Sequence, residues 1–141
     1  MNAMEKLAVL KGRGVKLTLQ RCAIMEFLDK NRVHPTAEEI FEGIRASYPG
    51  VSRATVYNSL EVFKRHGMVR EIIVESHRAR YDGEIAPHHH FLCQRCGRIY
   101  DVASHEVTFA ATHTCHGHEV EECKVYLFGI CSSCVSEEHD A

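Results

Sequence analysis

The 141-residue chain lacks the features of a membrane or secreted protein. No apolar run approaches the roughly 18–20 residues of a membrane helix, and no apolar signal-peptide segment follows Met1. The seven cysteines are an odd number and four of them have metal-ligand spacing, which favours a reducing cytoplasm over secretion. The sequence also has no internal repeat and no low-complexity tract. With 45% hydrophobic residues, it predicts one cytoplasmic domain or two small ones.

The chain has little net charge, −2, but its two halves differ. Residues 1–83 carry 14 Lys and Arg against 10 Asp and Glu, whereas residues 84–141 carry 3 against 9. The basic half indicates an anionic partner, and the acidic, histidine-rich half suits a bound cation. The alternative is that the charges are distributed by chance, so the choice between these two interpretations depends on the motifs.

Two C-x-x-C pairs are the strongest motif: Cys93 with Cys96, and Cys131 with Cys134. Each pair can direct two thiolates at one ion, and two pairs complete the tetrahedral shell of Zn²⁺. The 34 residues between the pairs exceed the roughly 15–20 of an ordinary zinc ribbon, so we expect the ion to join the two ends of a small domain. A domain of this size is marginally stable without such a staple. Disulfides or thiol exchange are the alternatives.

The first half predicts successive helices followed by a β-hairpin, which is a winged-helix arrangement. The expected helices cover residues 4–10, residues 18–31 with Thr18 as cap, a segment from Thr36 to a stop at Pro49-Gly50, and a segment from Ser52 to Gly67. The hairpin strands are expected near residues 69–74 and 79–81, and a hinge at 83–87. The second half predicts strands at 90–92, 98–102 and 123–130, a helix near 104–114, and a frayed tail at 137–141. The predicted fold is α+β, with domains 1–83 and 84–141.

The helix that begins after Ser52 carries polar side chains suited to reading DNA. Arg53 and Tyr57 share a face because they are four residues apart. Arg can bind guanine, Asn58 can bind adenine, an aromatic ring can contact a thymine methyl, and Lys64 can bind phosphate. An ordinary solvated helix face is the alternative. The order of helix, glycine turn and hairpin favours DNA binding.

A second possible metal site combines three imidazoles with two carboxylates. His88 and His90 alternate along a strand and therefore point to one side, whereas His89 points to the other. With His34, Asp82 and Asp101 they form a ligand set suited to Fe²⁺, Mn²⁺ or Zn²⁺. One ion holding all five would fix the angle between the two halves. Taken singly, each of these residues has an ordinary structural explanation.

A third group contains Cys115, His116, His118 and Cys123, with His113 nearby. Another ion, a disulfide and no function are all open for it. Cys22 lies on the apolar side of its helix and is expected in the core.

In combination, these segments resemble the ferric uptake regulator family over almost the whole chain. The resemblance rests on Leu17-Thr18-Leu19-Gln20-Arg21, His34-Pro35-Thr36-Ala37-Glu38-Glu39-Ile40, Ala54-Thr55-Val56-Tyr57, Gly67-Met68-Val69, Pro87-His88-His89-His90-Phe91-Leu92-Cys93 and both C-x-x-C pairs. It implies a dimeric, metal-dependent repressor of palindromic operator DNA, with a winged-helix domain and a mixed α/β dimerisation domain. It implies that Tyr57 contacts DNA. Together with the other polar residues of this helix, the expected DNA contacts are Arg53, Thr55, Tyr57, Asn58 and Lys64.

Within that family the chain is similar to the peroxide-responsive repressor branch. This similarity implies a structural Zn²⁺ on the four cysteines and a regulatory Fe²⁺ or Mn²⁺ on His34, Asp82, His88, His90 and Asp101. It also implies that peroxide converts His34 or His88 to 2-oxo-histidine. Iron-sensing members usually have Glu at the positions of Asp82 and Asp101. Iron, zinc or nickel sensing without peroxide sensing is the alternative.

Two other classes of protein are disfavoured by the motifs. A metalloenzyme would need a positioned general base, and no H-E-x-x-H motif is present. A thiol redox protein needs only one C-x-x-C pair, whereas two pairs match the four ligands of a zinc site. The chain is therefore predicted not to be an enzyme, and to have no small-molecule substrate.

Overall fold

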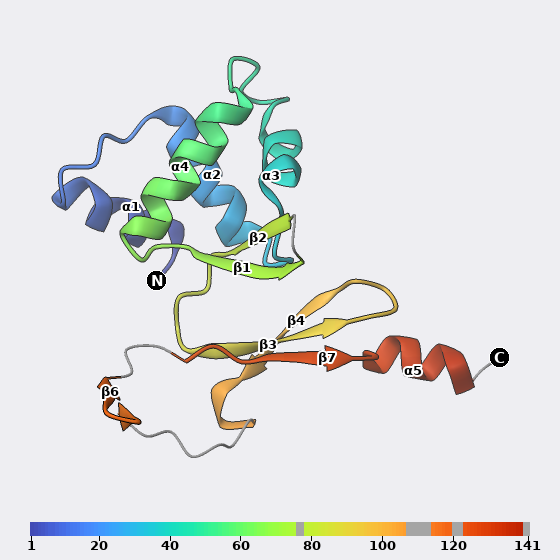
Figure 1. Cartoon of the computed structure of the whole chain (residues 1–141). Helices are drawn as coiled ribbons and strands as arrows, with labels where there is room; N and C mark the ends of the chain where they lie inside the picture. Colours follow the sequence, from blue (N-terminus) through green and yellow to red (C-terminus); the bar gives the residue numbers. More distant parts are fainter. Residues whose placement is uncertain (76–77, 107–113, 120–122, 140–141) are drawn as a thin grey trace. The chain divides into compact units, whose positions relative to one another are not determined.

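The computed structural model describes residues 1–75, 78–106, 114–119 and 123–139. The chain divides into two compact units, Met1–Ile85 and Ala86–Ala141. The first unit holds four helices and a two-stranded sheet, and the second holds a three-stranded sheet (Figure 1). The predicted α+β class, with a winged helix followed by a mixed α/β unit, is confirmed.

Three of the four helices of the first unit begin where the predicted capping residues place them. The four helices are α1 (Ala3–Gly12), α2 (Leu19–Lys30), α3 (Ala37–Ile44) and α4 (Arg53–Arg65), and the three that begin at predicted caps are α2, α3 and α4. The side chains of Thr18, Thr36 and Ser52 each accept a hydrogen bond from the backbone N–H three residues on, which satisfies a donor that the first helical turn leaves open. Thr36 and Glu39 complete a capping box.

The core of this unit is formed by apolar residues of all four helices and the hairpin. Val56, Leu60 and Phe63 of α4 are fully buried, as their spacing predicts. Gly67 follows α4 with a φ of 72°, a left-handed conformation that glycine adopts without strain. β1 (Arg70–Glu75) and β2 (Arg78–Asp82) then pair antiparallel to form the wing.

The sheet of the second unit has the strand order β4-β3-β7. β3 (His88–Cys93) pairs antiparallel with β4 (Ile99–Ala103) and parallel with β7 (Tyr126–Gly129). A 3-10 helix, η1 (Ser104–Glu106), follows β4. The short strands β5 (Thr114–Cys115) and β6 (His118–Glu119) pair antiparallel with each other. The helix α5 (Ser132–His139) follows β7.

Some of the predicted boundaries were wrong. α3 ends at Ile44 rather than at Pro49-Gly50, because the backbone tightens into turns in which the N–H groups of Ser47 and Tyr48 bond to the Ile44 carbonyl. The strand predicted at 123–130 is confined to β7. The tail predicted to fray from residue 137 is helical to His139. Of the helix predicted at 104–114, the described part is η1, and residues 107–113 lie outside the described residues.

In the described part of the chain, no helix is both long and apolar enough to cross a membrane.

Candidate metal centres and nucleic-acid interface

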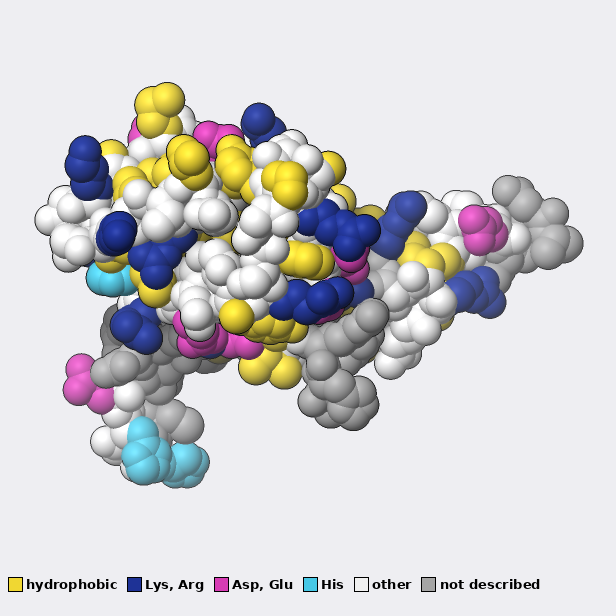
Figure 2. All heavy atoms as spheres, turned by 90° about the horizontal axis from the view of Figure 1, so that it is seen from above, with side chains coloured by type: hydrophobic (Ala, Val, Ile, Leu, Met, Phe, Trp, Pro, Cys, Tyr) yellow, Lys and Arg dark blue, Asp and Glu magenta, His cyan; other side chains and the backbone are white. Residues whose placement is uncertain are grey.

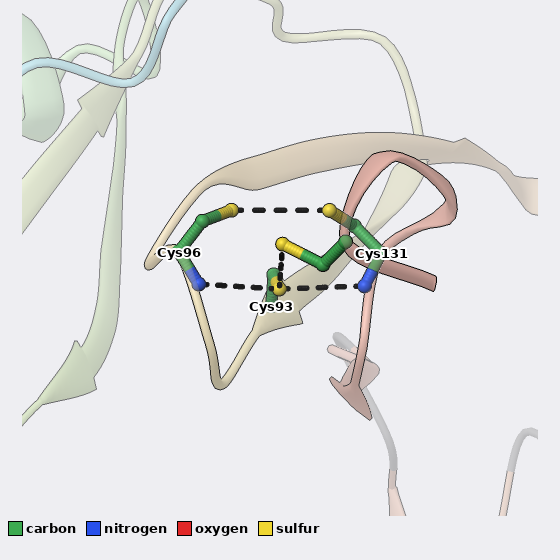
Figure 3. A group of neighbouring side chains, drawn as sticks. Cys93, Cys96 and Cys131 are labelled. Carbon is green, nitrogen blue, oxygen red and sulfur yellow. Dashed lines mark hydrogen bonds between the residues drawn. The ribbon is translucent and has the colours of Figure 1, made fainter. Parts of the chain in front are cut away.

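The four predicted zinc ligands converge at one end of the sheet in the second unit (Figure 3). β3 ends at Cys93, and Cys96 lies in the following turn. Cys131 lies between β7 and α5, and Cys134 lies in α5. The Sγ atoms of Cys93 and Cys134 are 3.8 Å apart, as are those of Cys96 and Cys131. A tetrahedral ion with Zn–S bonds of about 2.3 Å requires sulfur atoms about 3.8 Å apart. The donor set therefore fits Zn²⁺.

Backbone N–H groups prepare Cys93 to act as a thiolate. The N–H groups of Cys96 and Cys131 donate to its Sγ over 3.4 and 3.3 Å, and these bonds lower its pKa to about 6. The Tyr100 hydroxyl lowers the pKa of Cys131, whereas burial raises that of Cys134 to about 12. Sequence reasoning missed Tyr100, because no motif spacing places a hydroxyl from β4 beside a thiol after β7.

Among the described residues, these cysteines also form most of the core of the second unit. Cys93, Cys131 and Cys134 are buried, with Phe91 and Tyr100 packed against them. Such a small apolar cluster stabilises little by itself, so an ion on the thiolates would contribute folding free energy directly.

His34 and Asp82 form a buried pair within the first unit. The Nε2 atom of His34 lies 3.6 Å from Oδ2 of Asp82, and their side chains are 3% and 4% exposed. His34 has a φ of 55°, which is unusual for a residue other than glycine. Its carbonyl accepts a hydrogen bond from Arg80 of β2, and the Tyr81 N–H bonds to the next carbonyl, that of Pro35. The wing thus holds His34 in a conformation that the local sequence does not favour.

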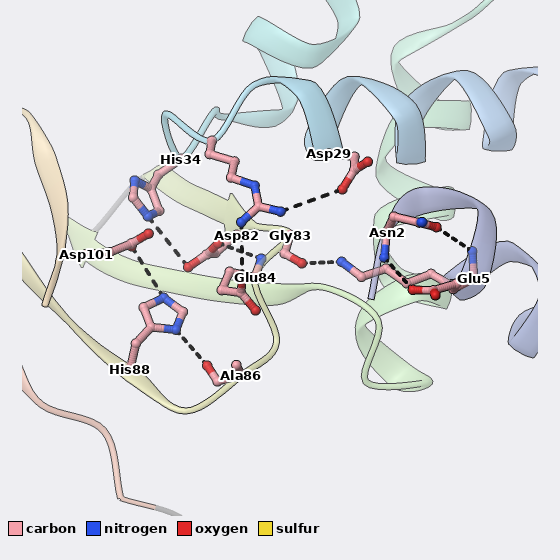
Figure 4. Close-up of polar contacts among 12 residues, drawn as sticks. Asn2, Glu5, Asp29, His34, Asp82, Gly83, Glu84, Ala86, His88 and Asp101 are labelled. Atoms are coloured by element: carbon pink, nitrogen blue, oxygen red, sulfur yellow. Dashed lines mark hydrogen bonds and ion pairs between the residues drawn. The ribbon is translucent and has the colours of Figure 1, made fainter. Parts of the chain in front are cut away.

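His88, His90 and Asp101 form a second group, within the second unit. Figure 4 shows His88 and Asp101 of this group. The rings of His88 and His90 lie 4.5 Å apart on one side of β3, as predicted. Asp101 pairs with His90 across β3 and β4, and its Oδ1 lies 3.3 Å from Nε2 of His88 and 3.6 Å from Nε2 of His90. Nδ1 of His88 lies 2.7 Å from the Ala86 carbonyl, an arrangement that leaves Nε2 as the donor for a metal.

The residues predicted to contact DNA lie on α4 with different degrees of access. Arg53, Tyr57 and Asn58 are exposed, and Thr55 and Lys64 are half-buried. Glu38 accepts hydrogen bonds from Nε of Arg53 over 2.8 and 3.1 Å. Lys64 binds Glu61 and Glu71 over 2.8 and 2.7 Å, and these hydrogen bonds raise its pKa.

Viewed from the end at which α4 begins, the first unit shows scattered Lys and Arg side chains between exposed apolar ones (Figure 2). Arg53 and Lys64 would have to exchange carboxylates for phosphates or bases on binding DNA. Tyr57, which is 48% exposed, needs no such exchange.

The third histidine and cysteine group forms no buried site among its described side chains. His116, His118 and Cys123 are exposed. His113 and the side chain of Cys115 lie outside the described residues. Cys22 is half-buried rather than fully in the core.

Comparison with known proteins identifies the family of the chain that carries these ligand groups. Residues 12–128 match the Ferric uptake regulator family. The chain belongs to this family. It is 36% identical over 138 residues to the Peroxide operon regulator of Bacillus subtilis (strain 168), an alignment that covers 96% of this chain and 94% of that protein.

Solved structures of this ferric uptake regulator family share the fold. The Helicobacter pylori ferric uptake regulator matches with a TM-score of 0.72 at 20% identity, covering 94% of this chain and 91% of that one. PerR from Streptococcus pyogenes, a structure described in terms of peroxide sensing, matches with a TM-score of 0.55 at 28% identity, covering 95% and 94%. These relatives are named as regulators, and none of the three is named as an enzyme.

Proposed function

We propose that this protein is a metal-dependent transcriptional repressor that binds palindromic operator DNA as a dimer and is inactivated by peroxide. In this proposal residues 1–83 bind DNA, and residues 84–141 bind metal and dimerise. The supporting observation is that each unit contributes an imidazole–carboxylate group, His34 with Asp82 in one and His88 and His90 with Asp101 in the other. Together they supply three imidazoles and two carboxylates, a donor set suited to Fe²⁺ or Mn²⁺.

The two groups couple metal binding to DNA binding if they share one ion. In the proposed arrangement neither ligand group binds the ion tightly alone, so tight binding requires both groups. The five ligands then hold the two units at one fixed angle, and the population shifts toward that arrangement by the differential affinity of the ion. Paired α4 helices of a dimer at a fixed separation match two half-sites on one face of DNA.

The second unit carries an apolar surface suited to a second copy of the chain. A cavity of about 280 Å³ is lined by Phe91, Tyr100, Val102, Ile130, Cys131 and Ser132. Phe128, Ile130 and Val135 are exposed at 54%, 39% and 38%. Exposed apolar patches of this kind mark association surfaces, and this one supports the proposed homodimer.

Peroxide sensing follows from which ligands can be oxidised. Fe²⁺ held by these ligands would supply the redox chemistry that lets hydrogen peroxide, itself a two-electron oxidant, react beside them. An imidazole is oxidised much more readily than a carboxylate, so His34 or His88 would gain one oxygen atom at ring carbon while the peroxide becomes water. The oxidised ring is a poorer ligand, and the site loses its hold on the two units. Support comes from the similarity to the Bacillus subtilis Peroxide operon regulator and from Asp, not Glu, at positions 82 and 101.

The test is DNA binding with and without Mn²⁺ by ligand variants. Duplexes selected from a random pool by the Mn²⁺-loaded protein serve as operator, and anisotropy measures affinity. Groups that only hydrogen-bond to a metal ligand contribute about 10–100-fold in metal affinity. Asp101 and His34 are proposed to bind the ion directly, so Asp101→Ala or His34→Ala should lower Mn²⁺ affinity at least about 100-fold. Each variant should also abolish the Mn²⁺ effect on DNA binding.

The matched control is His105→Ala, which removes an exposed histidine close to Asp101 in the sequence. It should behave as the wild-type protein, and all variants should keep one Zn²⁺ per chain. Wild-type Mn²⁺ dependence in either ligand variant would refute the ligand assignment. An operator bound equally with and without metal would refute the proposed function itself.

A further inference from the structure

A tight turn follows the metal-binding residue Asp82 at the end of β2. The Glu84 N–H donates to Oδ1 of Asp82 over 2.8 Å. This bond holds Oδ1 in place, while Oδ2 faces Nε2 of His34 at 3.6 Å. The conformation of the turn therefore decides which oxygen Asp82 offers to an ion, and in which direction.

Lys6, 77 residues away on α1, binds this turn from inside the first unit. Its ammonium group donates to the carbonyl of Gly83, the residue between Asp82 and Glu84 (Figure 4 shows this carbonyl and its donor). Lys6 is only 2% exposed, among the most deeply buried side chains described in the chain. Burial lowers the pKa of Lys6, and the charges of Asp29 and Glu84 oppose that shift. A buried ammonium is costly unless it is paired, so a lysine here needs a specific reason.

Other contacts hold the same turn less firmly. Arg32 binds Glu84 over 3.0 Å, but its side chain is 58% exposed, and solvent weakens such pairs. Arg70 donates to the Ile85 carbonyl over 2.9 Å, one residue beyond the turn. A side chain at position 83 would meet the Leu28 carbonyl at 3.4 Å, so the turn rests on the end of α2. Lys6, in contrast, contacts the turn itself through a buried side chain.

We propose that Lys6 is a positioning residue for the regulatory metal, fixing the Gly83 peptide so that Asp82 presents Oδ2 to the ion. This inference rests on the proposed function. Without the ammonium, the Gly83 carbonyl loses its donor and the turn becomes more mobile. Metal binding must then also order Asp82, and this ordering lowers the affinity for the metal. Contacts that orient a metal ligand from behind contribute about 10–100-fold in affinity.

The test compares Lys6→Met with Lys11→Met in the full-length, zinc-loaded protein. Both variants remove one positive charge from α1, but Lys11 is exposed, so only Lys6→Met removes the contact with Gly83. Mn²⁺ affinity is measured from the electron paramagnetic resonance signal of free Mn²⁺. Lys6→Met should bind Mn²⁺ at least about 10-fold more weakly than wild type, and Lys11→Met within twofold of it.

Two further measurements separate positioning from general destabilisation. The visible spectrum of bound Co²⁺ should change in Lys6→Met but not in Lys11→Met, and zinc content should remain one per chain in both. Lys6→Gln, which keeps a polar group on a shorter stem, carries the test if Lys6→Met does not fold. Equal Mn²⁺ affinity and an unchanged Co²⁺ spectrum in the Lys6 variant overturn the proposal. A wild-type protein that binds no Mn²⁺ beside its zinc instead overturns the proposed function, and this inference with it.

Discussion

Cys93 combines burial with a strong tendency to ionise. It is 1% exposed, yet two backbone N–H groups lower its pKa to about 6 from an ordinary 9.0. A thiolate binds Zn²⁺ and a thiol does not, so this residue is ready for the ion at neutral pH. Cys134, with a pKa raised to about 12, must instead release its proton when the ion binds.

Zinc retention should depend on pH, because protons compete with the ion for all four thiolates. Because the folded-state pKa of Cys93 is lowered, the stabilising contribution of this thiolate is complete above about pH 9 and is lost as pH falls through about 6. We expect zinc to be retained at pH 7.5 and released in dialysis below about pH 6, with atomic absorption as the measurement. Cys93→Ser should lose zinc even at pH 7.5. Cys22→Ser, which lies outside the cluster, is the control, and equal zinc loss in both variants would contradict the assignment.

At the scale of single elements, α4 presents the exposed aromatic side chain of Tyr57 and two cations, Arg53 and Lys64, that are already paired. Arg53 is held by Glu38, and its guanidinium lies 4.6 Å from the centre of the Phe41 ring. Lys64 is held between Glu61 and Glu71. In the proposed complex DNA would have to replace these pairs, so neither cation would contribute its full attraction, whereas Tyr57 is already accessible.

Tyr57→Ala should weaken operator binding without changing metal content. A base contact of this kind contributes about 1–3 kcal/mol, so we expect roughly a 10-fold or greater loss in affinity, measured by anisotropy at fixed salt. Asn31→Ala, at the end of α2 in the same unit, is a control away from α4. If Tyr57→Ala bound the operator like wild type, α4 would not read DNA through this face.

The helices of the first unit were predictable because their signals are local. Thr18, Thr36 and Ser52 mark helix starts, and the spacing of Val56, Leu60 and Phe63 marks a buried face. The short strands β5 and β6 and the helix α5 were missed, since two-residue strands and a weakly amphipathic helix leave no such pattern. The positive φ of His34 was also unpredictable, because hydrogen bonds from the distant β2 impose it.

Across the whole molecule, the ligand types were predictable and their orientation was not. Doubled C-x-x-C spacing identifies four thiolates, and alternation along β3 places His88 and His90 together. The contacts that orient these ligands come from residues remote in sequence, such as Arg80 at His34 and Lys6 at Gly83. No residue pattern near a ligand predicts such partners, so only the folded structure reveals them.

The response of the whole protein to peroxide depends on the metal that it carries. Fe²⁺ reduces hydrogen peroxide readily and Mn²⁺ does so far less, although both suit the same imidazole and carboxylate ligands. The Fe²⁺ form should therefore lose operator binding at low peroxide, whereas the Mn²⁺ form should stay bound. Mass spectrometry should find a mass increase of about 16 Da, one oxygen atom, on the peptide that contains His34 or His88. His105, exposed and outside the ligand groups, should remain unmodified in the same digest. If the Fe²⁺ form kept both operator binding and unmodified histidines, peroxide sensing would be excluded and iron sensing by the same ligands would take its place.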